Sequence, residues 1–319
     1  MRPHLARMKK WMALAGLAVL AACGPEEEVA KEPGFYNMFA ADTLAYRADY
    51  KEVPQLSAEP ISLEEASGGV AAHGAEGCFW TFNDSGNLPE LYLIHGASGQ
   101  VVHQLVLDGL NNTDWESMDC YRASDSTYKL VIADIGDNRE RRKWVTAYQF
   151  DEPNVAALDT VEGPQVYTPQ GLDSVSFTYS TGPRDVEAFF VDPLTSDWYL
   201  ISKRESAAGV YKLTAPFTQF QDTARLVGRF TLTLATAADS KALPNLGSPI
   251  VVKNYDHLLY WPREAGTTVE EALQATPQRL HYDPREPQGE ALWLWPNGDI
   301  GTCSELKGEE PKIRRYERK

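Results

Sequence analysis

The sequence predicts an all-β fold, a single β-propeller of five blades with six as the alternative, from three observations. An acidic residue recurs in five short motifs at intervals of 51, 71, 52 and 51 residues. Between these motifs lie short stretches rich in β-branched and aromatic residues, separated by turn residues. Little of the chain has helical periodicity, and the best helical candidate, 269–275, is short. A repeat near fifty residues made of short strands is typical of sheet blades arranged in a ring.

The five recurring acids are Glu65, Glu116, Glu187, Asp239 and Glu290. The long interval lies between Glu116 and Glu187, where the segment 152–171 is rich in Pro, Gly and Asp and has the composition of an insertion. We therefore treat each acid as the start of one repeat unit.

Each unit supplies strand candidates in order along the chain. In the first unit they are 68–73, 78–83, 90–95 and 101–107. In the second they are 116–121, 128–134, 144–150 and 175–179. In the third they are 186–191, 198–203, 209–213 and 226–232. In the fourth they are 235–239, 250–255, 258–261 and 279–282. In the fifth they are 290–295, 299–303 and 312–316.

The fifth unit is one strand short. We expect residues between about 50 and 61 to supply the missing strand and to close the ring, because closure removes exposed sheet edges. A degenerate sixth blade between 35 and 61 is the alternative.

The first 22 residues are expected to be a lipoprotein signal peptide. A positive segment is followed by a short apolar run, 11–20, which is too short for a membrane span. The sequence Leu20-Ala21-Ala22-Cys23-Gly24 resembles the bacterial lipobox, in which the cysteine becomes lipidated. Lipid chains on Cys23 would hold the protein at a membrane. An ordinary secretory signal is the alternative.

Residues 23–34 have no apolar periodicity and are expected to form an acidic flexible tether before a propeller domain, 35–319. The cluster 26–28 resembles the surface-export signal of Bacteroidota lipoproteins, and a simple spacer is the alternative. These features predict a cell-envelope protein anchored in the outer membrane, surface-exposed if the export signal holds, and a monomer.

The net charge of the chain indicates which kinds of partner it can bind. Removing the leader takes the formal net charge from −15 to −19. A chain this acidic is not expected to bind nucleic acid, which needs a basic face.

The remaining thiols, Cys78, Cys120 and Cys303, are odd in number, and either a Cys78–Cys120 disulfide or three unpaired thiols are consistent with the sequence.

In a propeller the innermost strand of each blade lines a central channel, so the five recurring acids should surround one mouth of that channel. Polar residues at the end of the next strand should converge on the same mouth: Asn83, Asp84, Asp134, Asp137, Asn138, Asp185 and Glu305. Hard oxygen ligands with little histidine suit Ca²⁺ better than Mg²⁺. The alternative is that these acids shape turns by bonding backbone amides.

Three cations, Lys203, Arg204 and Lys253, fall among these residues. They would either neutralise the carboxylates, whose repulsion otherwise raises their pKa values, or bind an anionic ligand group.

Six motifs in order carry a resemblance: Asn83 to Asn87, Asp114 to Glu116, Ala133 to Asn138, Asp185 to Ala188, Thr236 to Asp239 and Gln288 to Ala291. The chain resembles a group of secreted and lipid-anchored bacterial propellers of unassigned activity. More distantly it resembles the calcium propellers of the phytase, gluconolactonase and paraoxonase families, in its inward acids and not in an active-site string. The fourth unit departs from the pattern, because the turn after Asp239 lacks the usual Pro-Asp-Gly.

Two functions remain open at this point, and so does whether the chain is an enzyme. One is a binding or scaffold propeller with a structural Ca²⁺ and an unidentified small-molecule or surface ligand, since no histidine neighbours a motif serine as a triad would require. The other is a Ca²⁺-dependent hydrolase of phosphate or carboxylic (lactone) esters, with metal-polarised substrate and a free acid as base. A quinone-dependent dehydrogenase is a weaker third option. No nucleotide-binding glycine motif is present.

Overall fold

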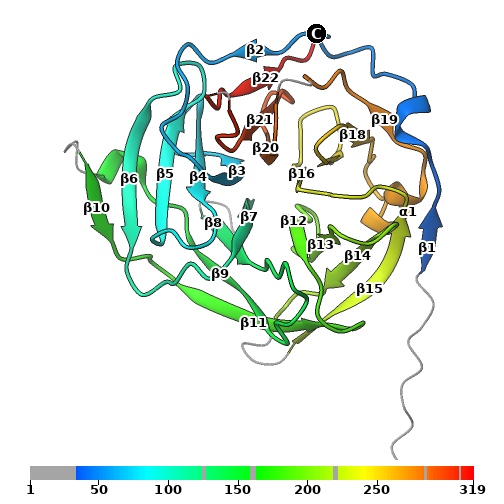
Figure 1. Ribbon diagram of the computed structural model, residues 1–319, viewed down its shortest axis with the longest axis horizontal. Helices are drawn as coiled ribbons and strands as arrows, with labels where there is room; N and C mark the ends of the chain where they lie inside the picture. The colour runs from blue at the N-terminus through cyan, green and yellow to red at the C-terminus, as the bar shows by residue number, and fades with distance from the viewer. Residues whose placement is uncertain (1–33, 124–126, 159–162, 218–221, 284–285, 309) are drawn as a thin grey trace, which may run out of the picture. The chain divides into compact units, whose positions relative to one another are not determined.

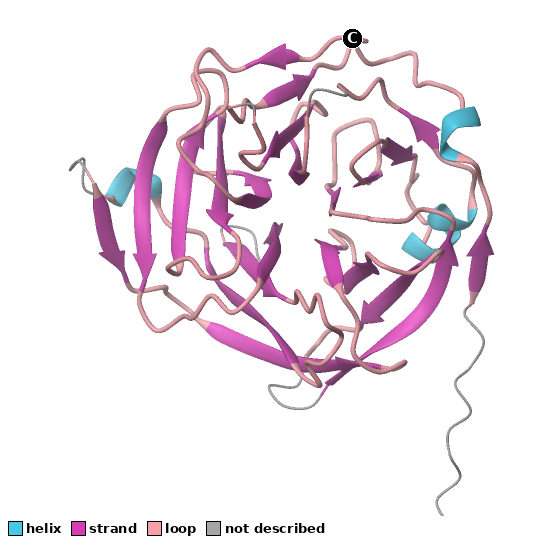
Figure 2. Ribbon diagram, in the orientation of Figure 1, coloured by secondary structure: helices cyan, strands magenta, loops and turns pink. Residues whose placement is uncertain are grey.

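The computed structural model describes residues 34–123, 127–158, 163–217, 222–283, 286–308 and 310–319. The strands belong to the compact unit Glu32–Lys319. They form five groups of four antiparallel strands arranged around a central space, which we number as blades one to five in chain order (Figure 1). The all-β architecture and the propeller arrangement predicted from the sequence are confirmed (Figure 2).

The blades are built as follows. Blade one contains β3 (Ala66–Ala71), β4 (Cys78–Asn83), β5 (Glu90–His95) and β6 (Val101–Leu107). Blade two contains β7 (Trp115–Arg122), β8 (Tyr128–Asp134), β9 (Val145–Asp151) and β11 (Asp173–Tyr179). Blade three contains β12 (Val186–Val191), β13 (Trp198–Ser202), β14 (Ala208–Leu213) and β15 (Asp222–Phe230). Blade four contains β16 (Ala237–Ser240), β17 (Ile250–Lys253), β18 (Leu258–Trp261) and β19 (Gln278–Arg279). Blade five contains β20 (Gly289–Leu294), β21 (Ile300–Ser304), β22 (Arg314–Tyr316) and β2 (Gln55–Leu56).

The N-terminal segment closes the ring, as predicted. Strand β2 pairs antiparallel with β22, with Gln55 opposite Arg315, and so completes blade five. Each inner strand contacts the next, and β20 contacts β3. The other N-terminal strand, β1 (Phe35–Asn37), adds to β15 of blade three in parallel. The described part of 35–61 therefore extends existing blades and forms no sixth one.

The insertion after blade two differs from a plain connection. It contains β10 (Pro164–Tyr167), which pairs in parallel with β6 of blade one. Proline at the first position of an edge strand costs no ladder hydrogen bond. The insertion thus covers the outer edge of the neighbouring blade.

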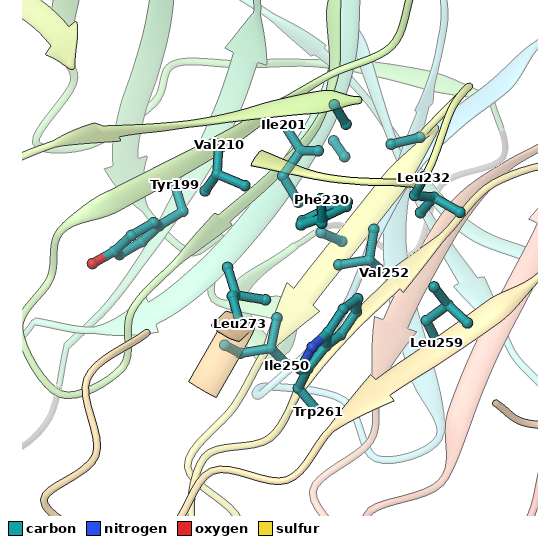
Figure 3. Close-up of a cluster of buried hydrophobic side chains, with 14 of the residues drawn as sticks. Tyr199, Ile201, Val210, Phe230, Leu232, Ile250, Val252, Leu259, Trp261 and Leu273 are labelled. Carbon is teal, nitrogen blue, oxygen red and sulfur yellow. The ribbon is translucent and has the colours of Figure 1, made fainter. Parts of the chain in front are cut away.

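The core lies between neighbouring blades. The inner strands are buried on both faces, whereas outer strands such as β6 and β11 alternate buried with partly exposed residues. Figure 3 shows one such interface, where side chains of blades three and four meet Leu273 of α1 (Val269–Gln274). The helix begins with a capping box, in which Thr268 Oγ1 accepts the Glu271 N–H and Glu271 accepts the Thr268 N–H.

Three further observations complete the fold. The short 3₁₀ helices are η1 (Ala41–Thr43) and η2 (Val155–Ala157). Cys78, Cys120 and Cys303 are buried free thiols, so the possible Cys78–Cys120 disulfide is wrong. Within the described residues, no helix has the length and apolar composition needed to cross a membrane.

Candidate functional site: an acidic mouth of the central channel

Three glutamates reach the channel through the same backbone irregularity. Glu116, Glu187 and Glu290 each stand second in an inner strand, at the residue where the pairing register skips. A β-bulge of this kind leaves one residue unpaired and re-aims its side chain. Blade one has Gly68 at the bulge, with φ of 64°, and Glu65 lies in the turn that precedes β3.

These carboxylates line one pocket, which we call the acidic mouth. Its volume is about 390 Å³. Of the sequence-predicted residues it is lined by Glu65, Asp84, Glu116, Asn138, Glu187, Lys203, Arg204, Glu290 and Glu305. Four of the five recurring acids are therefore brought together, with two cations and three members of the second polar set.

Asp84 is the centre of the acidic mouth. Its carboxylate belongs to two groups of three oxygens. One group includes Asp114 and Glu116, and the other includes Glu290 and Glu305. Within each group the oxygens lie within 4.8 Å of one another. Burial raises the pKa of Asp84 to about 7, and the charges of Asp114 and Glu290 add to that rise. Burial and the neighbouring Glu290 likewise raise the pKa of Glu305 to about 7.

Glu116 is the least exposed of the recurring acids in the mouth. Its residue is 3% exposed, and its carboxylate has no hydrogen bond or ion pair among the described residues. Burial, followed by repulsion from Glu187, raises its pKa well above the ordinary value. Gly136 lies directly behind it, because a Cβ at that position would come within 2.3 Å of Glu116 Oε1. A carboxylate so little exposed and surrounded by like charges is costly to ionise, and a cation held by oxygen ligands would remove that cost.

The two cations of the mouth are paired with its acids. Lys203 Nζ forms an ion pair with Glu187 and lies 3.7 Å from Glu290 Oε1. Burial acts to lower the pKa of Lys203, but these two carboxylates raise it above its ordinary value. Arg204 Nε lies 2.5 Å from Asp185 Oδ2, and its Nη2 donates to Asn138. This pairing favours the neutralising role over anion binding.

Lys253 does not belong to the acidic mouth, which corrects its grouping with the other two cations. It is fully buried, and its Nζ donates to the Gly289 carbonyl and lies 5.2 Å from the centre of the Tyr282 ring. Burial lowers its pKa, opposed by Glu286. Its amino group joins blade four to the inner strand of blade five.

Several members of the second polar set also lie behind the mouth. Asp134 accepts from Arg142 Nη2 at 2.6 Å, and Asp137 accepts the Arg142 N–H at 2.6 Å. Asp185 accepts the Asp137 N–H at 3.1 Å. Asn83 Oδ1 accepts the Glu65 N–H at 3.2 Å. Asp137 therefore shapes a turn, the alternative that the sequence left open, whereas Asp134 forms an ion pair and Asp185 and Asn83 bond backbone amides of other segments.

Asp239 lies away from the acidic mouth, so its expected place in the ring is wrong. Its Oδ2 accepts the Leu294 N–H at 2.7 Å, and its Oδ1 lies 3.5 Å from Lys241 Nζ. Lys241 also pairs with Asp119. The inner strand of blade four has no bulge. Thr236 of blade four is equivalent to Ser67 of blade one, because the hydroxyl of each donates to a backbone carbonyl at the start of the next blade's inner strand.

The sequence interpretation missed other residues of the mouth. Asp114 stands in the same motif as Glu116 and joins its oxygen group. Tyr255 donates to Glu290 Oε1 at 2.7 Å, and Lys307 lies 3.6 Å from Glu305. The motif itself could have identified Asp114, whereas no local signal identifies Tyr255 or Lys307.

Comparison with known proteins adds little. The chain matches no protein-family model and no curated protein. Among solved structures, a calcium-binding protein, regucalcin, from Agrobacterium tumefaciens strain C58 is similar at 13% identity and a TM-score of 0.39, over 89% of this chain and 80% of that chain. An α-L-arabinanase from Penicillium chrysogenum in complex with arabinobiose is similar at 12% identity and a TM-score of 0.40, over 83% of this chain and 96% of that chain. At these values neither similarity bears on the function of this chain.

Proposed function

We propose that this protein is a lipid-anchored β-propeller of the cell envelope, a binding or scaffold protein whose acidic mouth binds Ca²⁺. The observation that carries the metal proposal is the Glu116 carboxylate, which is buried, lines the mouth and faces the like charges of neighbouring carboxylates. Its neighbours offer only oxygen ligands, the chemistry that Ca²⁺ prefers.

The residues that would hold the ion are those of the two oxygen groups that share Asp84: Asp84, Asp114, Glu116, Glu290 and Glu305. Burial and like-charged neighbours raise the pKa of Asp84, Asp114, Glu116 and Glu305, and the bound cation would supply positive charge there. Glu187 is excluded from this set because Lys203 already neutralises it.

A binding role is supported by what lines the mouth. No histidine or cysteine is among the described residues that line it, so a nucleophile paired with an imidazole base is not assembled there. The ligand of the propeller is unidentified.

The hydrolase alternative is favoured by one observation, the pKa of about 7 at both Asp84 and Glu305. A carboxyl group that titrates near neutrality can act as a general acid or base. Turnover of phosphate esters or lactones that requires Ca²⁺ and is lost in Glu305→Gln would support this alternative, and its absence across such a panel would leave the binding role.

The Ca²⁺ proposal is tested by thermal unfolding of the full chain. At free Ca²⁺ one hundred times its dissociation constant, the free energy of unfolding should rise by about 2.7 kcal/mol. Glu116→Gln should lose most of this gain. Glu264→Gln removes the same charge at an exposed position and should retain it. A wild-type protein without any Ca²⁺-dependent rise would refute the metal site.

The anchor is a separate part of the proposal. Cys23, its lipobox and the tether as far as residue 33 lie outside the described residues, so this part rests on the sequence pattern. Cys23→Ala should move the protein from the membrane fraction to the soluble fraction of the cells that produce it. Continued sedimentation with membranes would reject lipidation at Cys23.

A further inference from the structure

The opposite mouth of the channel is hollowed as well. A cavity of about 530 Å³ lies there, lined by the ends of the inner strands and by the segments that follow them. Ala71, Val191, Ser240 and Leu294 show that four blades reach it, and Cys120 of β7 supplies the fifth. This second cavity shares no lining residue with the acidic mouth.

Three potential metal ligands of different chemistry meet beside it, and two of them, His73 and Cys120, line it. His73 follows β3, Cys120 lies in β7 and Glu152 follows β9, so the cluster joins blades one and two. His73 Nδ1 lies 3.5 Å from Cys120 Sγ and 3.5 Å from Glu152 Oε2. One ligand atom from each residue falls within a 4.8 Å group.

The arrangement differs from a catalytic triad. In a triad the imidazole uses its two nitrogens separately, one toward the nucleophile and the other toward the carboxylate. Here the thiol and the carboxylate both face Nδ1 of His73. A neutral imidazole nitrogen either carries one hydrogen or accepts one, so it can at most share a single hydrogen between the two neighbours, whereas a cation between them would be bound by all three.

The ligands are held in place by groups around them. Glu152 Oε1 accepts the His73 N–H at 2.8 Å and the Trp80 Nε1–H at 3.0 Å, which leaves Oε2 to face the imidazole. The His73 ring stacks on Tyr128 with centroids 3.7 Å apart. Such outer contacts orient ligands at metal sites.

Burial and charge fit a divalent ion. Cys120 is 2% exposed, and the Glu152 side chain is 7% exposed. One thiolate and one carboxylate would neutralise a 2+ ion, and the nearby Lys241 is already neutralised by Asp119 and Asp239. Binding would release the thiol proton of Cys120 to solvent.

We propose that Cys120 Sγ, His73 Nδ1 and Glu152 Oε2 form a Zn²⁺ site at the second mouth of the channel. Sulfur, nitrogen and oxygen ligands together suit Zn²⁺ and exclude the oxygen-preferring Ca²⁺. Three protein ligands would leave a fourth coordination position for water or a small anion. The site is independent of the acidic mouth and of its proposed ion.

The test measures metal in the full chain. Protein stripped with chelator is loaded with Zn²⁺, desalted and analysed for bound zinc, and one ion per chain is expected. Cys120→Ser and His73→Ala should lower the Zn²⁺ affinity at least tenfold, and Trp80→Phe, which frees Glu152, should lower it by about 10- to 100-fold. Cys303→Ser removes a buried thiol elsewhere and should keep the ion.

Co²⁺ gives a spectroscopic readout of the thiolate ligand. The wild type and Cys303→Ser should show a thiolate-to-cobalt charge-transfer band in the near ultraviolet, and Cys120→Ser should lack it. Glu116→Gln should bind Zn²⁺ normally, which separates this site from the acidic mouth. Absence of both zinc and the cobalt band from the wild type, or equal zinc in Cys120→Ser and Cys303→Ser, overturns the proposal.

Discussion

Asp119 and Asp239 occupy equivalent positions in blades two and four, and both face the amino group of Lys241. Asp119 Oδ2 accepts the Val191 N–H and Asp239 Oδ2 accepts the Leu294 N–H, each from the inner strand of the following blade. This relationship holds neighbouring blades together at the end of the channel opposite the acidic mouth.

Removing the Lys241 amino group should destabilise the fold. Lys241→Met would leave two buried carboxylates without a counter-charge, and breaking a buried ion pair typically costs 3–5 kcal/mol. Urea unfolding should therefore show a loss of about 3 kcal/mol, partly recovered by Lys241→Met with Asp239→Asn. Unchanged stability would show that this ion pair contributes little.

The stability of the metal-free protein should fall as pH rises from about 5 to about 8. Asp84, Asp239 and Glu305 each have a pKa raised to about 7, chiefly by burial. In this window the folded state holds more protons than the unfolded state, whose carboxyls titrate near 4, so raising the pH favours unfolding.

Urea unfolding in chelator at pH 5, 6, 7 and 8 measures this slope. Asp84→Asn with Glu305→Gln should flatten it. Ca²⁺ should have its largest stabilising effect at the upper end of the range, where the carboxylates are ionised. A stability that rises through the window would contradict the buried environment of these acids.

A second buried ion pair joins blades three and four. Arg263 Nη1 lies 2.7 Å from Asp192 Oδ1 and its Nη2 lies 3.0 Å from Oδ2, with both residues 2% exposed. Burial acts to raise the pKa of Asp192, but Arg263 holds it below its ordinary value. Arg263→Met should lower the free energy of unfolding by about 3–5 kcal/mol, and adding Asp192→Asn should restore part of it. If the double variant lost as much stability as the two single variants added together, the coupling between Arg263 and Asp192 would be contradicted.

Closure by the N-terminal segment should depend on Tyr50. Its ring is 2% exposed and packs among residues of blades four and five, and its hydroxyl donates to the Gly298 carbonyl at 2.7 Å. Tyr50→Ala should cost about 3–5 kcal/mol. Tyr36→Ala, at a ring that is 53% exposed, should change stability by less than about 0.5 kcal/mol. Equal effects of the two substitutions would show that the segment is not anchored through Tyr50.

Much of the architecture follows from local pattern. Short runs such as 78–83, 90–95 and 186–191 are strands with the bounds that composition and turn residues predict. The missing fourth strand of the last unit also predicted that earlier residues close the ring, because an unpaired edge has unsatisfied backbone groups. Glu116, Glu187 and Glu290 share a position in their strands, so their convergence was predictable as well.

Tertiary structure decided the rest. The spacing of two acids in the sequence gives only the number of residues between them, whereas the position of each acid in the channel depends on the register in which its strand pairs. Asp239 stands at the position of Asp119 and not at that of Glu116, so it lies at the opposite mouth despite intervals of 52 and 51 residues. Lys253 is removed from the acidic mouth by contact with the Gly289 backbone of another blade. The cluster of His73, Cys120 and Glu152 exists only because two blades pack side by side. Side chains that meet across blades have no local sequence pattern, since only packing of the folded chain brings them together.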